Sequence, residues 1–521
     1  MKNFNLRFLY LFFVALFGYL LFYSYTSEQN ISNAVDQEEV STNYLAGFNE
    51  SQIHILENSL LEIVVDTVNG NILSSRLKDY PVVPGSDGGV RVLGSGLDSD
   101  GEQMRFYMSS GFADLESAGL SNKPSFSVVE SDKGRVVLKS GSLSKTITLS
   151  EGYEIYIKDS LDSSVVLKPY AQMLRTTGRG FDLDDMFISR SSYVGVAFNT
   201  KDDPYVSYRF RNIDNVSFDE RGGWVASVQK YFLAALIGSQ ENLYRYFARE
   251  PSDGSDIYSF GYIVESSNNN SFEHRLYIGP KIRKDLLAVA EDLELTIDMG
   301  WFWFLAQPLA ALLTVINGFV NNWGLSIIAL TILIKVVFWP LTGKGFRSMA
   351  NMRRVQPEMQ RIQERYKNDR QKLSMEMMTL YRKEGVNPMG GCLPMLASFP
   401  FFIALFFVLR ESLELRHAPF GLWLQDLSAP DPFFVLPVLM AALMYLTTRL
   451  NPTPPNADPT QVAVMKFMPI GISVLFVFFP SGLVLYSVAN SGVQLIQQTM
   501  LYRELGALEA VSYTHLRAHE T

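Results

Sequence analysis

The stretch that most constrains the fold is Ser326–Leu341 (SIIALTILIKVVFWPL), which is apolar except for a lysine in its interior. With a residue or two of flank it is long enough to cross the hydrocarbon core of a bilayer. A charge at that depth costs about 2.5 to 3.5 kcal/mol on insertion scales. We therefore expect Lys335 to face a hydrated interior or a partner. Thr331, one helical turn earlier, is predicted to share its face.

An alternative for Lys335 is that its long side chain reaches the membrane surface. Only six residues separate it from Leu341, about 9 Å of helical rise, so the headgroups are partly within reach. None of the other predicted spans carries an acid at mid-depth that would neutralise the lysine. Either water therefore reaches Lys335 from one side, or a binding partner places an acidic group beside it.

Five apolar segments in the C-terminal half are predicted to span the membrane: 325–341, 393–409, 433–448, 465–480 and 482–500. The loops between them indicate an orientation. Segment 342–392 has 11 bases and 5 acids and is expected in the cytoplasm, with 449–466 on the same side. The loop 410–432 has two bases and four acids and is expected outside.

Residues 1–25 contain an apolar run that follows Lys2 and Arg7. It could be a secretory signal or an anchor. The run lacks a small-residue cleavage site and continues through bulky aromatic residues, which favours an uncleaved transmembrane anchor. Residues 26–52 are polar and acidic, as in a tether. The chain is thus predicted to cross the membrane six times, with both termini in the cytoplasm.

Residues 53–297 are predicted to form a large all-β sandwich outside the membrane. Apolar and polar residues alternate in Lys145–Leu149 and Tyr153–Lys158, and turn sequences such as Asp132–Gly134 separate the candidate strands. Helical spacing returns over 282–293.

From Tyr25 to Gly300 the acids number 40 and the bases 25, a net charge of −15, whereas the remainder has a net charge of +7. The single cysteine, Cys392, excludes an internal disulfide framework.

Residues 298–322 are apolar and aromatic but contain Gln307, Pro308, Asn317 and Gly318. We expect an interfacial amphipathic helix rather than a span. The helical core is predicted over 323–505. Within it, 342–392 should form a cytoplasmic helical hairpin of two helices, 347–369 and 370–384. The candidate functional residues of this hairpin are its basic residues Arg347, Arg353, Arg354 and Arg361. As an alternative, the segment is only a solvated loop that sets topology.

A polar stripe runs along the last predicted span, where Tyr486, Asn490 and Gln494 recur at helical spacing and Gln497 and Gln498 follow. Such a stripe should face protein or water rather than lipid. Interhelical hydrogen bonds are the simpler explanation, at about 0.6 to 2 kcal/mol each. Together with Lys335 and Thr331, the stripe favours a hydrated cavity within the bundle.

Sequence motifs for catalysis are lacking. The acidic runs Asp182–Asp185 and Asp98–Glu102 lack a complete set of calcium ligands and are typical of solvated turns. No serine, cysteine or histidine has a recognisable nucleophile context, and the five histidines form no metal-binding pattern. We expect no metal site, no cofactor, no enzymatic activity and no sequence-specific recognition of nucleic acid.

Several local motifs in the C-terminal half resemble one family, the YidC membrane protein insertases of Gram-negative bacteria. They include Gly300–Trp301, Pro340–Thr342, Ser348–Ala350, Val386–Pro388, Gly390–Cys392, Glu414–Arg416, Asp426–Ser428, Asp431–Pro432 and Phe479–Tyr486. The resemblance covers 300–505 densely and the β-domain more loosely. It implies a multi-domain membrane protein with a five-span α-helical insertase core, an N-terminal anchor helix and a large periplasmic β-sandwich.

The resemblance also implies a location and a function. The chain would lie in the bacterial inner membrane and insert and help to fold nascent membrane proteins, alone or with the Sec translocon. Clients would enter a hydrophilic groove, open to cytoplasm and lipid, lined by Thr331, Lys335, Tyr486, Asn490 and Gln494. Lysine at 335 stands where the family usually has arginine, which keeps the charge but loses the guanidinium fork. Ribosomes are a further implied partner, although 506–521 is not the family's usual basic tail.

Two other functions fit polar faces on membrane spans. A small-solute transporter is one, but the spans show no obvious repeated halves with matched broken helices. An assembly factor that uses the β-domain as a docking surface is the other. Insertion by the purified protein without Sec separates this second alternative from an insertase, and solute flux would indicate a transporter.

Overall fold

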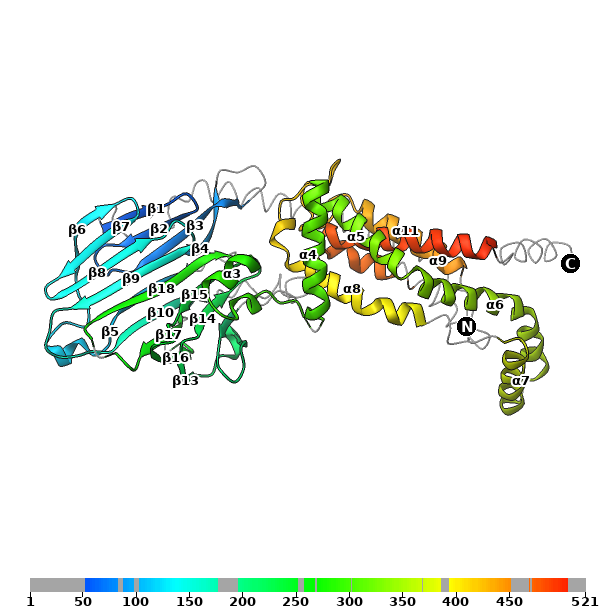
Figure 1. The fold of residues 1–521 in the computed structure, drawn as a ribbon, viewed down its shortest axis with the longest axis horizontal. Helices are drawn as coiled ribbons and strands as arrows, with labels where there is room; N and C mark the ends of the chain where they lie inside the picture. The colour runs from blue at the N-terminus through cyan, green and yellow to red at the C-terminus, as the bar shows by residue number, and fades with distance from the viewer. Residues whose placement is uncertain are drawn as a thin grey trace. The chain divides into compact units, whose positions relative to one another are not determined.

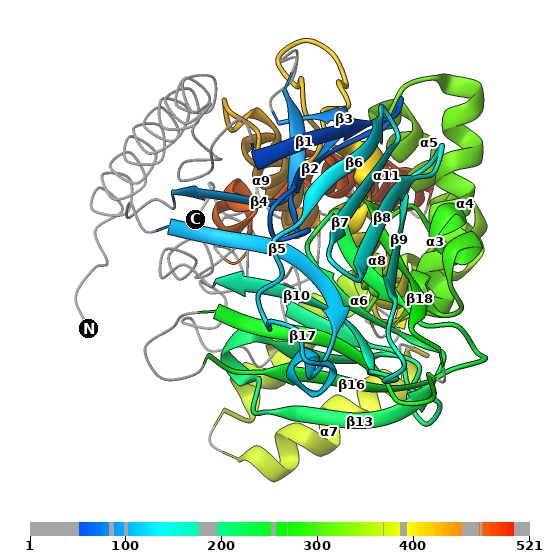
Figure 2. The ribbon, with the colours of Figure 1, turned by 90° about the vertical axis from the view of Figure 1, so that its left-hand side faces the viewer.

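The fold is known from a computed structural model, which describes residues 52–82, 88–97, 103–176, 195–251, 257–267, 269–300, 302–367, 369–385, 393–450, 468 and 471–504. The chain divides into two compact units, 1–298 and 299–521 (Figures 1 and 2). The predicted anchor, tether and C-terminal tail lie outside the described residues, as do Cys392 and both acidic runs.

The first unit is a sandwich of two nine-stranded antiparallel sheets, so the predicted all-β class is confirmed (Figure 2). The first sheet contains, in spatial order, β1 Ile53–Glu57, β2 Leu61–Asp66, β3 Ile72–Pro81, β4 Gly89–Leu97, β5 Gln103–Phe112, β10 Pro169–Thr176, β17 Ile257–Val264, β16 Leu243–Arg249 and β13 Val216–Arg221. The second contains β12 Val206–Arg209, β11 Gly195–Phe198, β14 Trp224–Val228, β15 Phe232–Ile237, β18 Ser271–Pro280, β9 Glu154–Leu161, β8 Leu143–Leu149, β7 Arg135–Ser140 and β6 Ser127–Asp132.

The burial of the strands follows their sequence pattern. In β8 and β9 alternate side chains are buried, as expected for strands with one face on a core. By contrast, β14 and β15 are buried along their whole length. Their second face is covered by α3 Arg283–Val289 and the 3₁₀ turn η6 Leu293–Thr296, whose leucines pack on it. The predicted helix over 282–293 is therefore shorter than expected, ending at Val289.

The second unit is helical, with a compact bundle and a helical hairpin (Figure 1). Its main helices are α4 Trp303–Val320, α5 Trp323–Val337, α6 Trp339–Arg365, α7 Arg370–Lys383, α8 Leu393–Glu411, α9 Val435–Leu450 and α11 Ser481–Glu504. Helix α11 packs against α5, α6, α8 and α9, and α4 packs against α5 and α8. Buried apolar residues from α4, α5, α8, α9 and α11 form one continuous core.

The predicted span 325–341 is not one straight helix. Helix α5 ends at Val337, and α6 starts at Trp339 after a bend of 67°. Pro340, in the first turn of α6, has no amide hydrogen and clashes with the carbonyl of a continuous helix. The chain therefore changes direction two residues after Lys335.

Among the described residues, α4 has the length and hydropathy to cross a membrane, and α5 with α6 also passes if the bent pair counts as one span. Pro308 lies inside α4 without breaking it. The interfacial position expected for this segment stays a prediction. The predicted span 465–480 falls partly outside the described residues. Its described part, 468 and 471–480, contains a short helical stretch and the 3₁₀ turn η9 Phe476–Phe478.

Candidate functional site

Lys335 is half-buried in the last turn of α5. It forms no hydrogen bond or ion pair with any residue that the structure describes. Its neighbours along the helix, Val336 and Val337, are largely exposed and apolar. A partly buried ammonium without a protein partner requires water or a ligand to solvate it. The hydrated surroundings expected for Lys335 stay a prediction.

Four further residues predicted to line the site lie on α5 and α11. Thr331 is 2% exposed, and its hydroxyl donates to the carbonyl of Ile327 at 2.7 Å, so it is satisfied within its own helix. Tyr486 is 5% exposed and its ring lies 5.8 Å from that of Phe402. Asn490 and Gln494 are half-buried. The side chains of Asn490 and Gln494 have no hydrogen-bond partner among the described residues.

Two neighbouring pairs relate α11 to α5 and to the start of α6. A Cβ on Gly482 would lie 3.6 Å from Cδ1 of Ile327. Farther along, Gln497 Nε2 donates to Thr342 Oγ1 at 2.7 Å. Both pairs are 155 residues apart in sequence.

The same offset places Asn490 level with Lys335, and Tyr486 level with Thr331. Since both helices rise about 1.5 Å per residue, equal steps from the Ile327–Gly482 contact reach equal depths. We call the set Thr331, Lys335, Tyr486, Asn490 and Gln494 the polar section. Two of its pairs, Thr331 with Tyr486 and Lys335 with Asn490, therefore lie at matching depths on two packed helices, and Gln494 lies one turn farther along α11.

Below the polar section the bundle is closed by the loop 412–434, which is hydrogen-bonded to the first residues of α11. The amide of Ser481 donates to the carbonyl of Ala429 at 2.7 Å, and that of Gly482 to Leu427 at 2.9 Å. On α5 the side chain of Asn322 donates to the carbonyl of Phe420 at 3.0 Å. The start of α5 and the start of α11 are thus held by one loop, which we call the plug.

Glutamines 497 and 498 prove to be structural. Gln497 is buried, and besides Thr342 it donates to the carbonyl of Trp339 at 3.3 Å. Gln498 is also buried and donates to the hydroxyl of Tyr502 at 3.1 Å. For Gln497 the simpler explanation, hydrogen bonding between helices, is correct, and this residue connects α11 to the start of α6, just past the bend. The bond from Gln498 to Tyr502 lies within α11.

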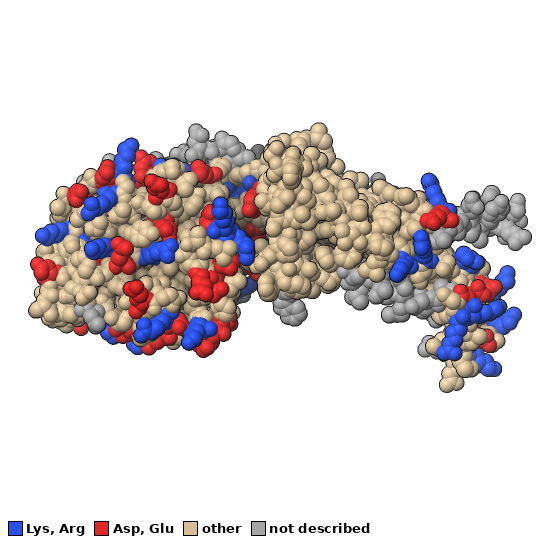
Figure 3. All heavy atoms as spheres, viewed as in Figure 1, with Lys and Arg blue, Asp and Glu red and all other residues tan. Residues whose placement is uncertain are grey.

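The basic residues predicted on the hairpin lie on α6. Arg347, Arg354 and Arg361 are exposed, and Arg353 belongs to the same helix. Helices α6 and α7 pack through Val355, Met359, Met377 and Leu380. On the face of the helical unit drawn in Figure 3, charged side chains gather mainly around α6 and α7, and the surface over α4 and α5 is uncharged. This distribution is typical of a bundle in lipid with a hairpin in water.

The sequence as a whole matches known proteins over nearly all of its length. The family described as 60Kd inner membrane protein matches residues 315–507, and the YidC periplasmic domain matches 53–312. The membrane protein insertase YidC of Haemophilus influenzae (strain PittEE) is 35% identical over 509 residues, covering 92% of this chain and 91% of the relative. That of Aeromonas salmonicida (strain A449) is 37% identical over 478 residues, covering 86% of each. The chain belongs to the YidC membrane protein insertase family.

Among solved structures, a crystal structure of an active YidC insertase with its first transmembrane domain resolved covers 86% of this chain and 92% of its own. The two share 19% sequence identity, with a TM-score of 0.39. The resemblance stated from the sequence motifs is confirmed by the family matches and the relatives.

The plug of this YidC family member was not predicted from its sequence, although Gly324 gives an indication of it. A Cβ on Gly324 would lie 2.1 Å from Cδ2 of Phe420, so only glycine lets the loop approach α5. Gly324 lies in the first turn of α5, where glycine is unfavourable for a helix unless something needs the space. Asp431 is also buried in the plug and accepts from the indole nitrogen of Trp423 at 3.0 Å.

We predict that Gly324→Ala lowers the thermal stability of this YidC family member, since Phe420 must move. Overpacking of this kind typically costs about 1 to 3 kcal/mol. Gly318→Ala in α4 is the matched control, because a Cβ there meets nothing within 4 Å and alanine favours helix. Unfolding of both variants in detergent micelles, followed by tryptophan fluorescence, provides the measurement. Equal midpoints for the two variants would contradict the close approach of the plug.

Proposed function

We propose that this chain inserts nascent membrane proteins, and that the polar section forms a hydrated path through part of the bilayer for their polar ends. The observation that carries the proposal is Lys335, a half-buried ammonium with no partner among the described residues, level with an amide side chain, Asn490, that also has none. The sequence relationship to membrane protein insertases supports it independently.

The path is closed at one end and open at the other. The plug fills the end where α5 and α11 begin, which the predicted topology places on the periplasmic side. The opposite end leads to the basic hairpin, which the same topology places in the cytoplasm with both termini. A client's polar end that enters from the cytoplasm therefore needs to cross only the remaining part of the low-dielectric barrier.

Lys335 supplies a counter-charge to that polar end when the end is acidic. Attraction between opposite charges is less screened at a partly buried site than in water. Asn490 supplies a hydrogen-bonding group at the depth of Lys335, and Tyr486 and Gln494 supply others one helical turn to either side on α11. The client's apolar segment then moves sideways into lipid, and its burial, at about 25 cal/mol per Å² of apolar surface, drives the step without nucleotide.

The other parts of the chain receive and hand on clients. The hairpin residues Arg347, Arg353, Arg354 and Arg361 would meet clients or ribosomes at the cytoplasmic surface, where their charges also contact lipid headgroups. The β-domain would dock on the Sec translocon when both act together. These partners are proposals from the family relationship, and the chain would also work without Sec on small clients.

The deciding experiment reconstitutes the purified protein into vesicles without Sec and offers a small client with two spans. Protection of the client's loop from added protease reports insertion. The proposal requires protection that depends on this protein. Protection only when Sec is added would make the chain an assembly factor. Flux of small solutes in place of client protection would make it a transporter.

A further inference from the structure

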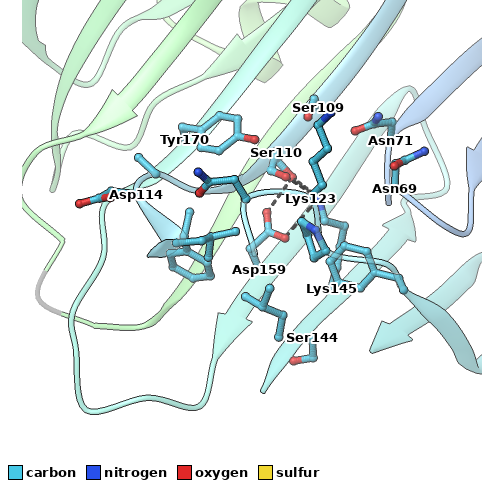
Figure 4. A pocket seen from close by; sticks show the side chains of 18 residues that line it. Asn69, Asn71, Ser109, Ser110, Asp114, Lys123, Ser144, Lys145, Asp159 and Tyr170 are labelled. Carbon is cyan, nitrogen blue, oxygen red and sulfur yellow. Dashed lines mark hydrogen bonds and ion pairs between the residues drawn. The ribbon is translucent and has the colours of Figure 1, made fainter. Parts of the chain in front are cut away.

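A pocket of about 450 Å³ lies in the β-domain, outside the helical unit (Figure 4). Residues of β5 and β10 from one sheet and of β8 and β9 from the other line it, together with the segment 112–126 that follows β5. Its volume falls within the range of about 300 to 1,000 Å³ that is usual for small-molecule sites. All of its lining residues are described in the structure.

A buried ion pair forms one wall of the pocket. Lys145 is 1% exposed and Asp159 3% exposed, and Nζ lies 3.4 Å from Oδ1. The same Nζ donates to the carbonyl of Ser110 at 2.7 Å and to its Oγ at 2.9 Å (Figure 4). The Ser110 hydroxyl in turn donates to Asp159 Oδ2 at 2.6 Å. The ammonium donates two hydrogen bonds and is neutralised by the carboxylate beside it, so this wall offers neither a free charge nor a general base to a ligand.

Ser110 is therefore not an activated nucleophile, although a lysine lies next to it. A serine–lysine pair reacts only when the amine is free to take the hydroxyl proton. Here the hydroxyl proton is directed at Asp159, and the amine is already donating. The arrangement is suited to holding a ligand and not to attacking one.

The rest of the lining is rich in uncharged polar groups. Carboxamides come from Asn69, Asn71 and Asn122, and a hydroxyl comes from Tyr170. Asn69 and Asn122 each donate one amide hydrogen to a neighbouring carboxylate, whereas the side chain of Asn71 has no hydrogen-bond partner among the described residues. Amides and hydroxyls both donate and accept hydrogen bonds. A ligand of this pocket should therefore present both kinds of group along its edge.

The charge balance and the apolar side chains of the lining restrict the chemical class of ligand further. The charged residues of the lining are Lys123 and Lys145 against Asp114 and Asp159, so their formal charges cancel. Phe112, Leu115 and Leu143 add an apolar wall, being buried members of one cluster. Hydrocarbon would leave the amides unpaired, and an ion would find no net opposite charge. We propose that this pocket binds an uncharged saccharide, whose hydroxyls meet the amides and whose C–H face meets the apolar wall.

The test uses the full chain in detergent micelles and hydrogen exchange read by mass spectrometry. Maltose and N-acetylglucosamine at millimolar concentration are expected to slow exchange in peptides that contain Asn71, Ser110 and Ser144. Asn71→Leu removes hydrogen-bond donors and an acceptor from the pocket. It should therefore weaken sugar binding and raise the half-saturating sugar concentration by about tenfold. Asn269→Leu is the matched control, since Asn269 is exposed and is not a lining residue, and should leave this concentration unchanged.

Two outcomes would overturn the proposal. Sugars are excluded from protein surfaces and stabilise folded states generally, so trimethylamine N-oxide, which acts only in that way, serves as a reference. Equal protection by both reagents, or equal protection in wild type and Asn71→Leu, means exclusion and no site. Protection by an uncharged tripeptide amide, with none by the sugars, means a peptide site instead.

Discussion

Lys335→Glu is expected to reduce insertion of clients with acidic leading ends by on the order of a hundredfold. Opposite charges about 6 Å apart at an effective dielectric constant of about 20 attract by about 3 kcal/mol, and loss of this attraction alone corresponds to about a hundredfold, so the added repulsion of a glutamate makes this the smallest effect expected. Lys335→Arg should retain activity, because the proposed path needs a positive charge and not a particular donor geometry. Protease protection of the client in Sec-free vesicles measures all three proteins.

Two controls separate charge in the polar section from charge in general. Lys344→Glu makes the same substitution at an exposed position on α6, nine residues after Lys335, and should insert clients normally. A client whose leading end is neutral should be affected much less by Lys335→Glu. Normal insertion of the acidic client by Lys335→Glu would remove the positive charge from the mechanism, even if the protein is an insertase.

The second large effect is expected in the β-domain, where Lys145→Met should cost about 3 to 5 kcal/mol of local stability. The substitution keeps the volume but leaves Asp159 as an unpaired charge in the sandwich. Hydrogen exchange in peptides from β8 and β9 measures this free energy without contributions from the helical unit. Lys158→Met is the matched control on β9, where the lysine is exposed, and should stay within about 0.5 kcal/mol of wild type.

The cost of Lys145→Met should also depend on pH. Burial tends to raise the pKa of Asp159, but Lys145, His274 and Ser110 outweigh it and hold the pKa below its usual range. The pair therefore stabilises the fold above the carboxyl's unfolded pKa, and this contribution is lost as pH falls through the lowered folded pKa. Without the lysine, burial dominates and protonation relieves the variant. The gap between the two proteins should be widest near neutral pH and narrow towards about pH 4.

The alternation in β8 and β9 predicts a buried charge in each strand as well as the strands themselves. Lys145 is in phase with Leu143, Ile147 and Leu149 in β8, and those three residues are buried. Asp159 is likewise in phase with the buried isoleucines of β9. A charged residue at the inward position of an alternating strand predicts a buried charge, and two such strands in sequence predict a pair. What the pattern could not give is the pocket beside the pair, which depends on the path of the segment after β5.

In the helical unit, local sequence gave the elements and the depth of the polar residues but not their partners. Thr331, Lys335, Tyr486 and Asn490 could be placed on helical faces from their spacing alone. The hydrogen bond between Thr342 and Gln497 joins residues 155 apart, and no local rule connects them. Pro340 is a local indication of the bend after Phe338, because proline removes a hydrogen bond to the preceding turn, although Pro308 lies inside α4 without breaking it. The apolar length of the segment outweighed that indication in the prediction of one span.

The bend also determines what kind of entrance Lys335 can have. Pro340 favours the bend, because the proline ring cannot continue a helix without losing a hydrogen bond to the preceding turn. Helix α5 therefore ends two residues after the lysine. Lys335 lies at the end of its helix rather than in the middle of a long one, so a client arriving from the side of α6 would meet the charge without passing a further turn of α5.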